Sequence, residues 1–351
     1  MDKISSYLLL HHMKLFNSGI ILRITALWAF SEAFMGGILH GFKIPFAGLA
    51  LSLVAAICMS LLAVHDNKRG VIFKATLVVI AVKFILSPHT PPMAYVAVMM
   101  EGLAGELFFM QRRFIRTSSF FLTLFCLMYS AFQHLLVLTI VFGKEFWTAL
   151  DTFLNKITNT FIKQPQQYSL YLVLFYLACY LIAGIFGGIL NSKIVARVQS
   201  GNKPVFLDAI NEKYPDGIKT INEEPLSAKK RKKIKWQFII AGILLLFLIL
   251  SYTPLFDKTI LRTKVLEIVI RGSVIIIVWT FLLSPLLIRR VGKWVEKYKS
   301  ESGSSLQEVL SLLPDIKRIV QVSWQMAAKK NKLKQFSDFI SNTMLLIVYG
   351  R

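Results

Sequence analysis

Eight long apolar runs, separated by shorter polar connections, constrain this chain more than any other feature of its sequence. A helix that crosses a bilayer needs about 20 mostly apolar residues. The runs cover residues 20–40, 45–65, 71–88, 92–111, 118–143, 169–191, 236–254 and 266–288. Hydrophobic residues make up 55% of the chain, against roughly 45–50% in a soluble domain. The sequence therefore predicts an all-α, polytopic helical membrane protein with about eight transmembrane helices.

Basic residues indicate which side of the membrane each connection occupies. The connections that follow the even-numbered spans are rich in Lys and Arg, at residues 66–74, 112–116, 193–235 and 289–297. Those that follow the odd-numbered spans are short or charge-balanced. Because basic connections remain in the cytoplasm, both termini are predicted to lie inside. This alternation also requires the weak third span, which contains Lys83.

A polar stretch at residues 193–235 divides the chain and ends in a run of lysine and arginine. We expect a six-span bundle over residues 1–192 and a basic cytoplasmic linker over 193–235. A two-span module follows at 236–290, and basic amphipathic helices in the cytoplasm occupy 291–351. The expected location is the bacterial inner membrane, which the chain crosses several times.

Two local patterns lie outside the apolar cores of the spans. The proline-rich segment 87–92 predicts a break between spans three and four, because a residue that precedes proline avoids the helical region. In residues 145–163, aromatic and aliphatic side chains recur at helical spacing with polar residues between them. This segment is predicted to form an amphipathic helix, either on the outer membrane surface or over the mouth of the bundle.

The tail is predicted to contain three helical pieces after a polar linker at 300–305. The first ends near Pro314, a basic amphipathic stretch continues to Lys334, and an apolar piece covers 336–349. Such a tail either binds anionic lipid or docks a soluble partner. The positions expected to contact a partner are Leu310, Pro314, Ile319, Trp324 and Phe336.

Ionisable residues inside spans are functional candidates, because each costs about 2.5–3.5 kcal/mol to insert. The spans contain Glu32, Lys83, Glu101, Glu106, His134 and Arg271. Sorted by depth, one set of polar side chains lies between the middle of the membrane and the outer ends of the spans, and it is expected to form a chamber open to the outside. It comprises His40, Lys83, His89, Tyr95, Glu101, Gln133 and His134.

Three interpretations of this chamber remain open. Lys83 and Glu101 can bind the ionised groups of a small polar solute. Histidines 40, 89 and 134 with Glu101 suit a borderline cation, but they lie on separate segments with no local ligand spacing, so no metal site is predicted. Alternatively the charges pair internally, for example Lys83 with Glu101, and only fix helix packing. The small residues Gly102, Ala104 and Gly105 are typical of closely packed membrane helices.

Other classes of function find little support. The net charge of +22 is segregated into connections and tail, without a basic groove for nucleic acid. No GxSxG, HExxH, P-loop or dinucleotide-binding motif is present. We therefore expect no catalytic residue and no cofactor.

The segments 36–46 (GGILHGFKIPF) and 94–107 (AYVAVMMEGLAGEL) resemble the substrate-binding S component of energy-coupling factor (ECF) transporters. Residues 236–351 are similar in layout to a reduced coupling end of the transmembrane T component. The resemblance implies capture of a small solute from outside and docking of the cytoplasmic helices onto ATPase subunits.

The expected function is thus an inner-membrane transport component that captures a small polar solute and couples to a cytoplasmic partner through residues 300–351. A non-transporting scaffold or assembly subunit of a larger complex is the alternative. A lipid-modifying membrane enzyme that uses Glu101 and His134 as acid and base ranks third.

Overall fold

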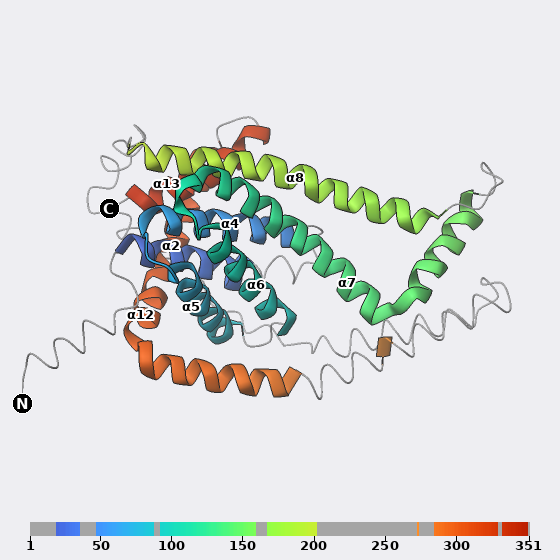
Figure 1. Ribbon diagram of the computed structural model, residues 1–351, viewed down its shortest axis with the longest axis horizontal. Helices are drawn as coiled ribbons and strands as arrows, with labels where there is room; N and C mark the ends of the chain where they lie inside the picture. The colour runs from blue at the N-terminus through green and yellow to red at the C-terminus, as the bar shows by residue number, and fades with distance from the viewer. Residues whose placement is uncertain are drawn as a thin grey trace, which may run out of the picture. The chain divides into compact units, whose positions relative to one another are not determined.

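The computed structural model describes residues 19–35, 47–87, 92–158, 167–201, 272–273, 284–328 and 332–349. Within these residues every element is helical (Figure 1), which confirms the all-α class. The elements are α2 (Gly19–Phe30), the π-helix η1 (Ser31–Met35), α4 (Ala47–His65), α5 (Val71–Leu86), α6 (Pro92–Phe108), the 3₁₀ turn η2 (Arg112–Phe114), α7 (Ile115–Thr158), α8 (Tyr168–Gln199), α12 (Ser284–Ala327) and α13 (Lys332–Tyr349).

Three helices in the described part of the chain are long and apolar enough to cross a membrane. They cover Gly48–His65, Ile115–Ile140 and Tyr168–Gln199, and correspond to predicted spans two, five and six. Helices α2, α5 and α6 have 12, 16 and 17 residues and form parts of predicted spans one, three and four. Span seven, at 236–254, and most of span eight lie outside the described residues. The count of eight and the orientation remain predictions.

The chain forms two compact units. The first comprises residues 1–130, 181–222 and 288–351, and the second comprises 131–180 and 223–287. In the first unit α5 packs against α6, and α2 packs against both α4 and α5. Large apolar side chains from these helices, such as Trp28, Ile57 and Ile72, are fully buried. The core of this unit is therefore an assembly of apolar helices.

Two glycines allow α6 to approach its neighbours closely, as the small residues of this segment predict. A Cβ added to Gly102 would lie 2.8 Å from Cβ of Thr76 on α5. A Cβ at Gly105 would lie 2.5 Å from the sulfur of Met59 on α4 and 3.1 Å from a methyl group of Ile72. The neighbours differ in stiffness, since threonine is β-branched and methionine is flexible.

The difference predicts unequal effects of two alanine substitutions. Gly102→Ala should lower the free energy of unfolding by about 1–3 kcal/mol, because overpacking against stiff Thr76 forces a backbone shift. Gly105→Ala should cost less, because the Met59 side chain can change its rotamer. Thermal melting of the two variants in the same detergent measures the difference. Equal melting temperatures would contradict this account of the α5–α6 contact.

Helix α7 breaks at Gly143, where the sequence predicts the boundary between span five and the amphipathic helix. Gly143 has φ 76° and ψ −175°, a conformation essentially restricted to glycine. The chain turns sharply there and continues as a helix to Thr158 (Figure 1). Within this second unit, Asp151 accepts hydrogen bonds from the backbone N–H and hydroxyl of Ser169, at 2.6 and 2.8 Å. The carboxylate thereby caps the first turn of α8.

The end of α8 is joined to α4 and α7 by a buried asparagine. Nδ2 of Asn191 lies 2.9 Å from Oγ of Ser60 on α4 and 2.9 Å from Oγ1 of Thr123 on α7. The same nitrogen approaches the backbone oxygens of Ala56 and Ser119. The Asn191 side chain thus contacts acceptors on both neighbouring helices. Such interhelical hydrogen bonds fix how α4, α7 and α8 are rotated relative to one another.

The C-terminal tail differs from the prediction in two places. Helix α12 runs unbroken from Ser284 to Ala327, so residues 300–305 are helical and Pro314 does not end the helix. A proline inside a helix removes one backbone hydrogen bond. The physical reason for the continuity is a buried apolar face that extends across the proline. Its members are Leu306, Val309, Leu313, Ile316, Ile319 and Val322.

The last helix, α13, is part of the first unit. It packs against α2, and its residues from Thr343 to Val348 are all buried. Nη1 of Arg197 on α8 donates to Oγ of Ser341 at 3.1 Å, and the hydroxyl of Tyr349 donates to the carbonyl of Val198 at 3.2 Å. The apolar piece at 336–349 therefore packs on the protein itself.

Candidate functional site

A buried ion pair joins α5 to the π-helical turn η1 at the end of α2. Nζ of Lys83 donates to Oε2 of Glu32 at 2.7 Å, and the two side chains are 6% and 4% exposed. Removal of a charge from water is costly unless an opposite charge and hydrogen bonds compensate. Each of these residues therefore provides the neutralising partner that the other needs.

Glu32 lies in η1, a single π-helical turn at the end of α2. A π-helix has a wider hydrogen-bonding ring than an α-helix, and such turns occur frequently at functional sites. Ser31 is the first residue of η1, and its Oγ donates a hydrogen bond to the carbonyl of Trp28 at 2.8 Å.

A second buried carboxylate lies in the same unit. Glu101 of α6 is 4% exposed, and its Oε1 accepts a hydrogen bond from Oγ of Ser52 on α4 at 2.5 Å. The three ionisable side chains in this charge cluster, Glu32, Lys83 and Glu101, comprise two carboxyl groups and one ammonium group. When both carboxyl groups are ionised, one negative charge is left over. A proton, a cation or the cationic group of a solute can balance that charge.

The observed pairing differs from the Lys83–Glu101 pair that the sequence analysis gave as an example of internal charge pairing. Lys83 pairs with Glu32, while Glu101 bonds to Ser52. Residue counting gives Glu32 and Lys83 the same depth, because each lies twelve residues beyond the predicted inner end of its span, residue 20 or 71, but it does not show that they face each other. Sequence reasoning also missed Ser52, since serine in an apolar helix carries no signal of its own.

Tyr95, another residue of the predicted chamber, is connected to the π-turn by two hydrogen bonds through Ser87. Its hydroxyl donates to the carbonyl of Ser87 at 3.3 Å, and Oγ of Ser87 donates to the carbonyl of Ala33 at 3.2 Å. Ala33 directly follows Glu32 in η1. These bonds join the start of α6, the end of α5 and the π-turn. Of the residues predicted to line a chamber, Lys83, Tyr95 and Glu101 lie in the first unit.

The other predicted chamber residues do not lie among the described residues of the first unit. Gln133 and His134 belong to the second unit, where His134 is exposed and its ring centroid lies 6.1 Å from that of Tyr176. His40 and His89 lie outside the described residues, as does Arg271. Over the described ranges, no three His, Cys, Asp or Glu side chains form a group that could hold a metal ion. The histidine-based metal interpretation therefore gains no support.

Glu106 has a structural role. Its carboxylate accepts hydrogen bonds from the backbone N–H groups of Gly70 and Phe73, the latter at 3.3 Å. These groups lie at the start of α5, where a negative charge is stabilised by the helix dipole. Glu106 thus caps α5 from a neighbouring helix.

The predicted partner-binding residues of the tail divide by exposure. Ile319 is buried and Leu310 is half-buried, whereas Pro314, Trp324 and Phe336 are exposed. The ring of Trp324 also contacts Phe339 of α13, with centroids 5.2 Å apart. Only the exposed residues can meet a partner without a change in the tail.

Comparison of the chain with protein-family models, with curated proteins and with solved structures finds no match. Function is therefore inferred from the buried charges and from the C-terminal helices.

The ion pair predicts a specific pattern in a double-mutant cycle. Lys83→Met should lower the free energy of unfolding by about 3–5 kcal/mol, because Glu32 would remain buried without its partner. Glu32→Gln combined with Lys83→Met should recover most of that loss, since no isolated charge remains. Unfolding in detergent, followed by tryptophan fluorescence, measures both variants.

Lys74→Met is the matched control, because Lys74 lies on the same helix and is exposed. It should change the free energy of unfolding little. If the double variant were no more stable than Lys83→Met alone, the two side chains would not be interacting.

Proposed function

We propose that the chain is a transport component of the bacterial inner membrane that captures a small polar solute from the outer side. The supporting observation is the buried charge cluster of Glu32, Lys83 and Glu101. Charged groups inside membrane bundles are expensive and commonly mark solute or ion pathways. The resemblance of residues 36–46 and 94–107 to an ECF S component supports the same class of function.

The pairing of the charges indicates which end of a solute the chamber prefers. Lys83 is already neutralised by Glu32 at 2.7 Å, so it offers little to an anionic group. The Glu101 carboxylate accepts a hydrogen bond from the neutral Ser52 hydroxyl. Among the described residues, no cationic side chain lies at hydrogen-bond distance from this carboxylate. A solute with an amine or another cationic group would complete the charge balance. The favoured solutes are therefore small amines and zwitterions.

This proposal predicts that binding depends on the charge of Glu101. A panel of small amines, amino acids and amine-containing vitamins would be screened for thermal stabilisation of the purified protein in detergent. Any compound that stabilises the wild type should lose about tenfold or more in affinity with Glu101→Gln, which corresponds to about 1.4 kcal/mol for one charge-assisted hydrogen bond.

Glu106→Gln is the control for this screen, because it removes a carboxylate of the same helix that caps α5. It should lower the melting temperature of the free protein and leave the affinity for the compound unchanged. Unchanged affinity in Glu101→Gln would exclude Glu101 as a solute contact. If no amine in the panel stabilised the protein, the preference for cationic solutes would be contradicted.

Energy for transport would come from a cytoplasmic partner, held by the exposed side of the tail. Trp324 and Phe336 are each 50% exposed, and large exposed aromatic residues are common anchors of protein interfaces. Lysines 329, 330, 332 and 334 lie between them in the sequence. The proposed partner is an ATPase subunit, since the chain contains no nucleotide-binding motif.

The coupling proposal predicts loss of the partner on substitution of Trp324. Affinity-tagged wild-type protein, isolated from its native host, should bring down a subunit that hydrolyses ATP, and Trp324→Ser should not. Deletion of residues 300–351 is unsuitable as the test, because α13 is buried in the first unit. Thr152→Val, an exposed substitution in the second unit, serves as the control. Equal recovery of the ATPase with Trp324→Ser would exclude this anchor.

A scaffold subunit is the second candidate, and one observation favours it. Glu32, Lys83 and Glu101 all have partners within the protein, as expected of groups that fix helix packing. The solute screen distinguishes the two functions. A scaffold would show no stabilising solute, and its assembly would tolerate Glu101→Gln.

A further inference from the structure

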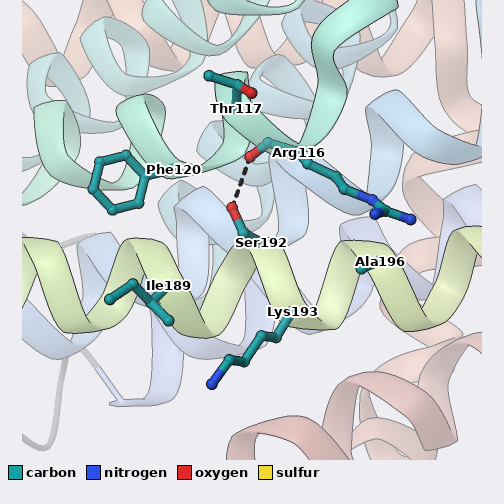
Figure 2. Close-up of a pocket in the computed structure, with 7 residues that line it drawn as sticks. All are labelled: Arg116, Thr117, Phe120, Ile189, Ser192, Lys193 and Ala196. Atoms are coloured by element: carbon teal, nitrogen blue, oxygen red, sulfur yellow. Dashed lines mark hydrogen bonds between the residues drawn. The ribbon is translucent and has the colours of Figure 1, made fainter.

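A groove lies between the beginning of α7 and the last turns of α8, within the first unit (Figure 2). Its volume is about 400 Å³. Arg116, Thr117 and Phe120 line it from α7, and Ile189, Ser192 and Lys193 from α8. The two helices are held together there, because Oγ of Ser192 donates to the carbonyl of Arg116 at 2.7 Å.

The groove has a cationic part and an apolar part. Phe120 and Ile189 lie at one end of the groove, and the Arg116 side chain extends toward the other end, while the exposed Lys193 side chain extends from α8 away from α7 (Figure 2). None of its lining residues is acidic. Nε of Arg116 donates to Oε1 of Gln199 at 3.1 Å, which orients the guanidinium group while its two amino groups provide further donors.

The apolar end of the groove continues into exposed apolar surface on the same helices. Phe121 of α7 is 50% exposed, and Ile185, Phe186 and Ile189 of α8 are 40%, 69% and 42% exposed. Both helices have the length and hydropathy of membrane spans. These side chains therefore suit contact with acyl chains, and the basic end lies where a span meets the headgroup region.

We propose that this groove binds an anionic phospholipid. Its phosphate would interact with Arg116 at the positive end of α7, and the exposed, flexible side chain of Lys193 would turn toward the headgroup from α8. An acyl chain would lie along Phe120 and Ile189. Basic pockets between helices at the cytoplasmic side of a bundle are suited to anionic headgroups. The positive-inside rule assigns this end of α7 and α8 to the cytoplasmic leaflet.

The apolar wall distinguishes a lipid from a free anion. Inorganic phosphate would use only the cationic end and leave Phe120 and Ile189 without a partner. A zwitterionic lipid carries a choline or amine group, which the groove meets with cations and no carboxylate. Charge complementarity therefore favours a lipid with net negative charge.

The experiment is native mass spectrometry of the full chain, released from mixed micelles that contain phosphatidylglycerol or phosphatidylcholine. The wild type should retain phosphatidylglycerol in preference to phosphatidylcholine. Arg116→Gln with Lys193→Gln should weaken phosphatidylglycerol binding by roughly thirtyfold, the effect of two basic residues near a headgroup. Arg116→Lys with Lys193→Arg keeps both charges and should preserve most of the preference.

Lys74→Gln with Arg290→Gln is the matched control, because it removes two exposed cations elsewhere in the first unit. It should bind phosphatidylglycerol like the wild type. Ile189→Asn should weaken retention of the lipid without abolishing its charge preference. An addition of inorganic phosphate at millimolar concentration should not displace the lipid.

Three results would overturn the proposal. The first is that the Arg116→Gln, Lys193→Gln variant prefers phosphatidylglycerol over phosphatidylcholine as strongly as the wild type does. The second is an equal loss in the Lys74→Gln, Arg290→Gln control, which would indicate a diffuse effect of charge. The third is displacement of the lipid by inorganic phosphate, which would identify a site for the free anion.

Discussion

The ion pair between Glu32 and Lys83 is the interaction on which the arrangement of the first unit depends. Two opposite charges that are both buried among apolar helices must meet, because neither can reach water. Their contact at 2.7 Å therefore fixes the π-helical end of α2 against α5. The bond between Ser52 and Glu101 joins α4 and α6 in the same way. Together the two contacts place three ionisable groups in one helical unit, and the transport proposal rests on this placement.

The same requirement explains the other polar residues on these helices. Asn191 finds acceptors on α4 and α7, Glu106 caps α5, and Asp151 caps α8. Each polar group has a partner on a different helix, so each contact also sets a rotation or a boundary. The exposed surface of α7 and α8 is, by contrast, largely apolar. Polar contacts between helices inside, with apolar side chains outside, are what a bilayer favours.

Some features follow from the sequence because their causes are local. The break at Gly143 needs a conformation that only glycine adopts readily, and the separation of α5 from α6 follows from prolines near residue 90. Pro314 shows the limit of such rules. There the burial of Leu313 and Ile316 on one face outweighs the lost backbone bond, and the helix continues. A local rule fails where contacts distant in sequence contribute more free energy.

The sequence by itself determined that the chain is helical, where several helices break, and which charged residues lie in apolar segments. Hydropathy and backbone preferences depend on each residue and its neighbours, so they can be read along the chain. Only the tertiary structure decided that Lys83 meets Glu32 and that α13 is buried against α2. Successive residues on a helix point about 100° apart, so a partner depends on how each helix is rotated about its axis. Packing between helices sets that rotation, and a single sequence does not encode it in any local pattern.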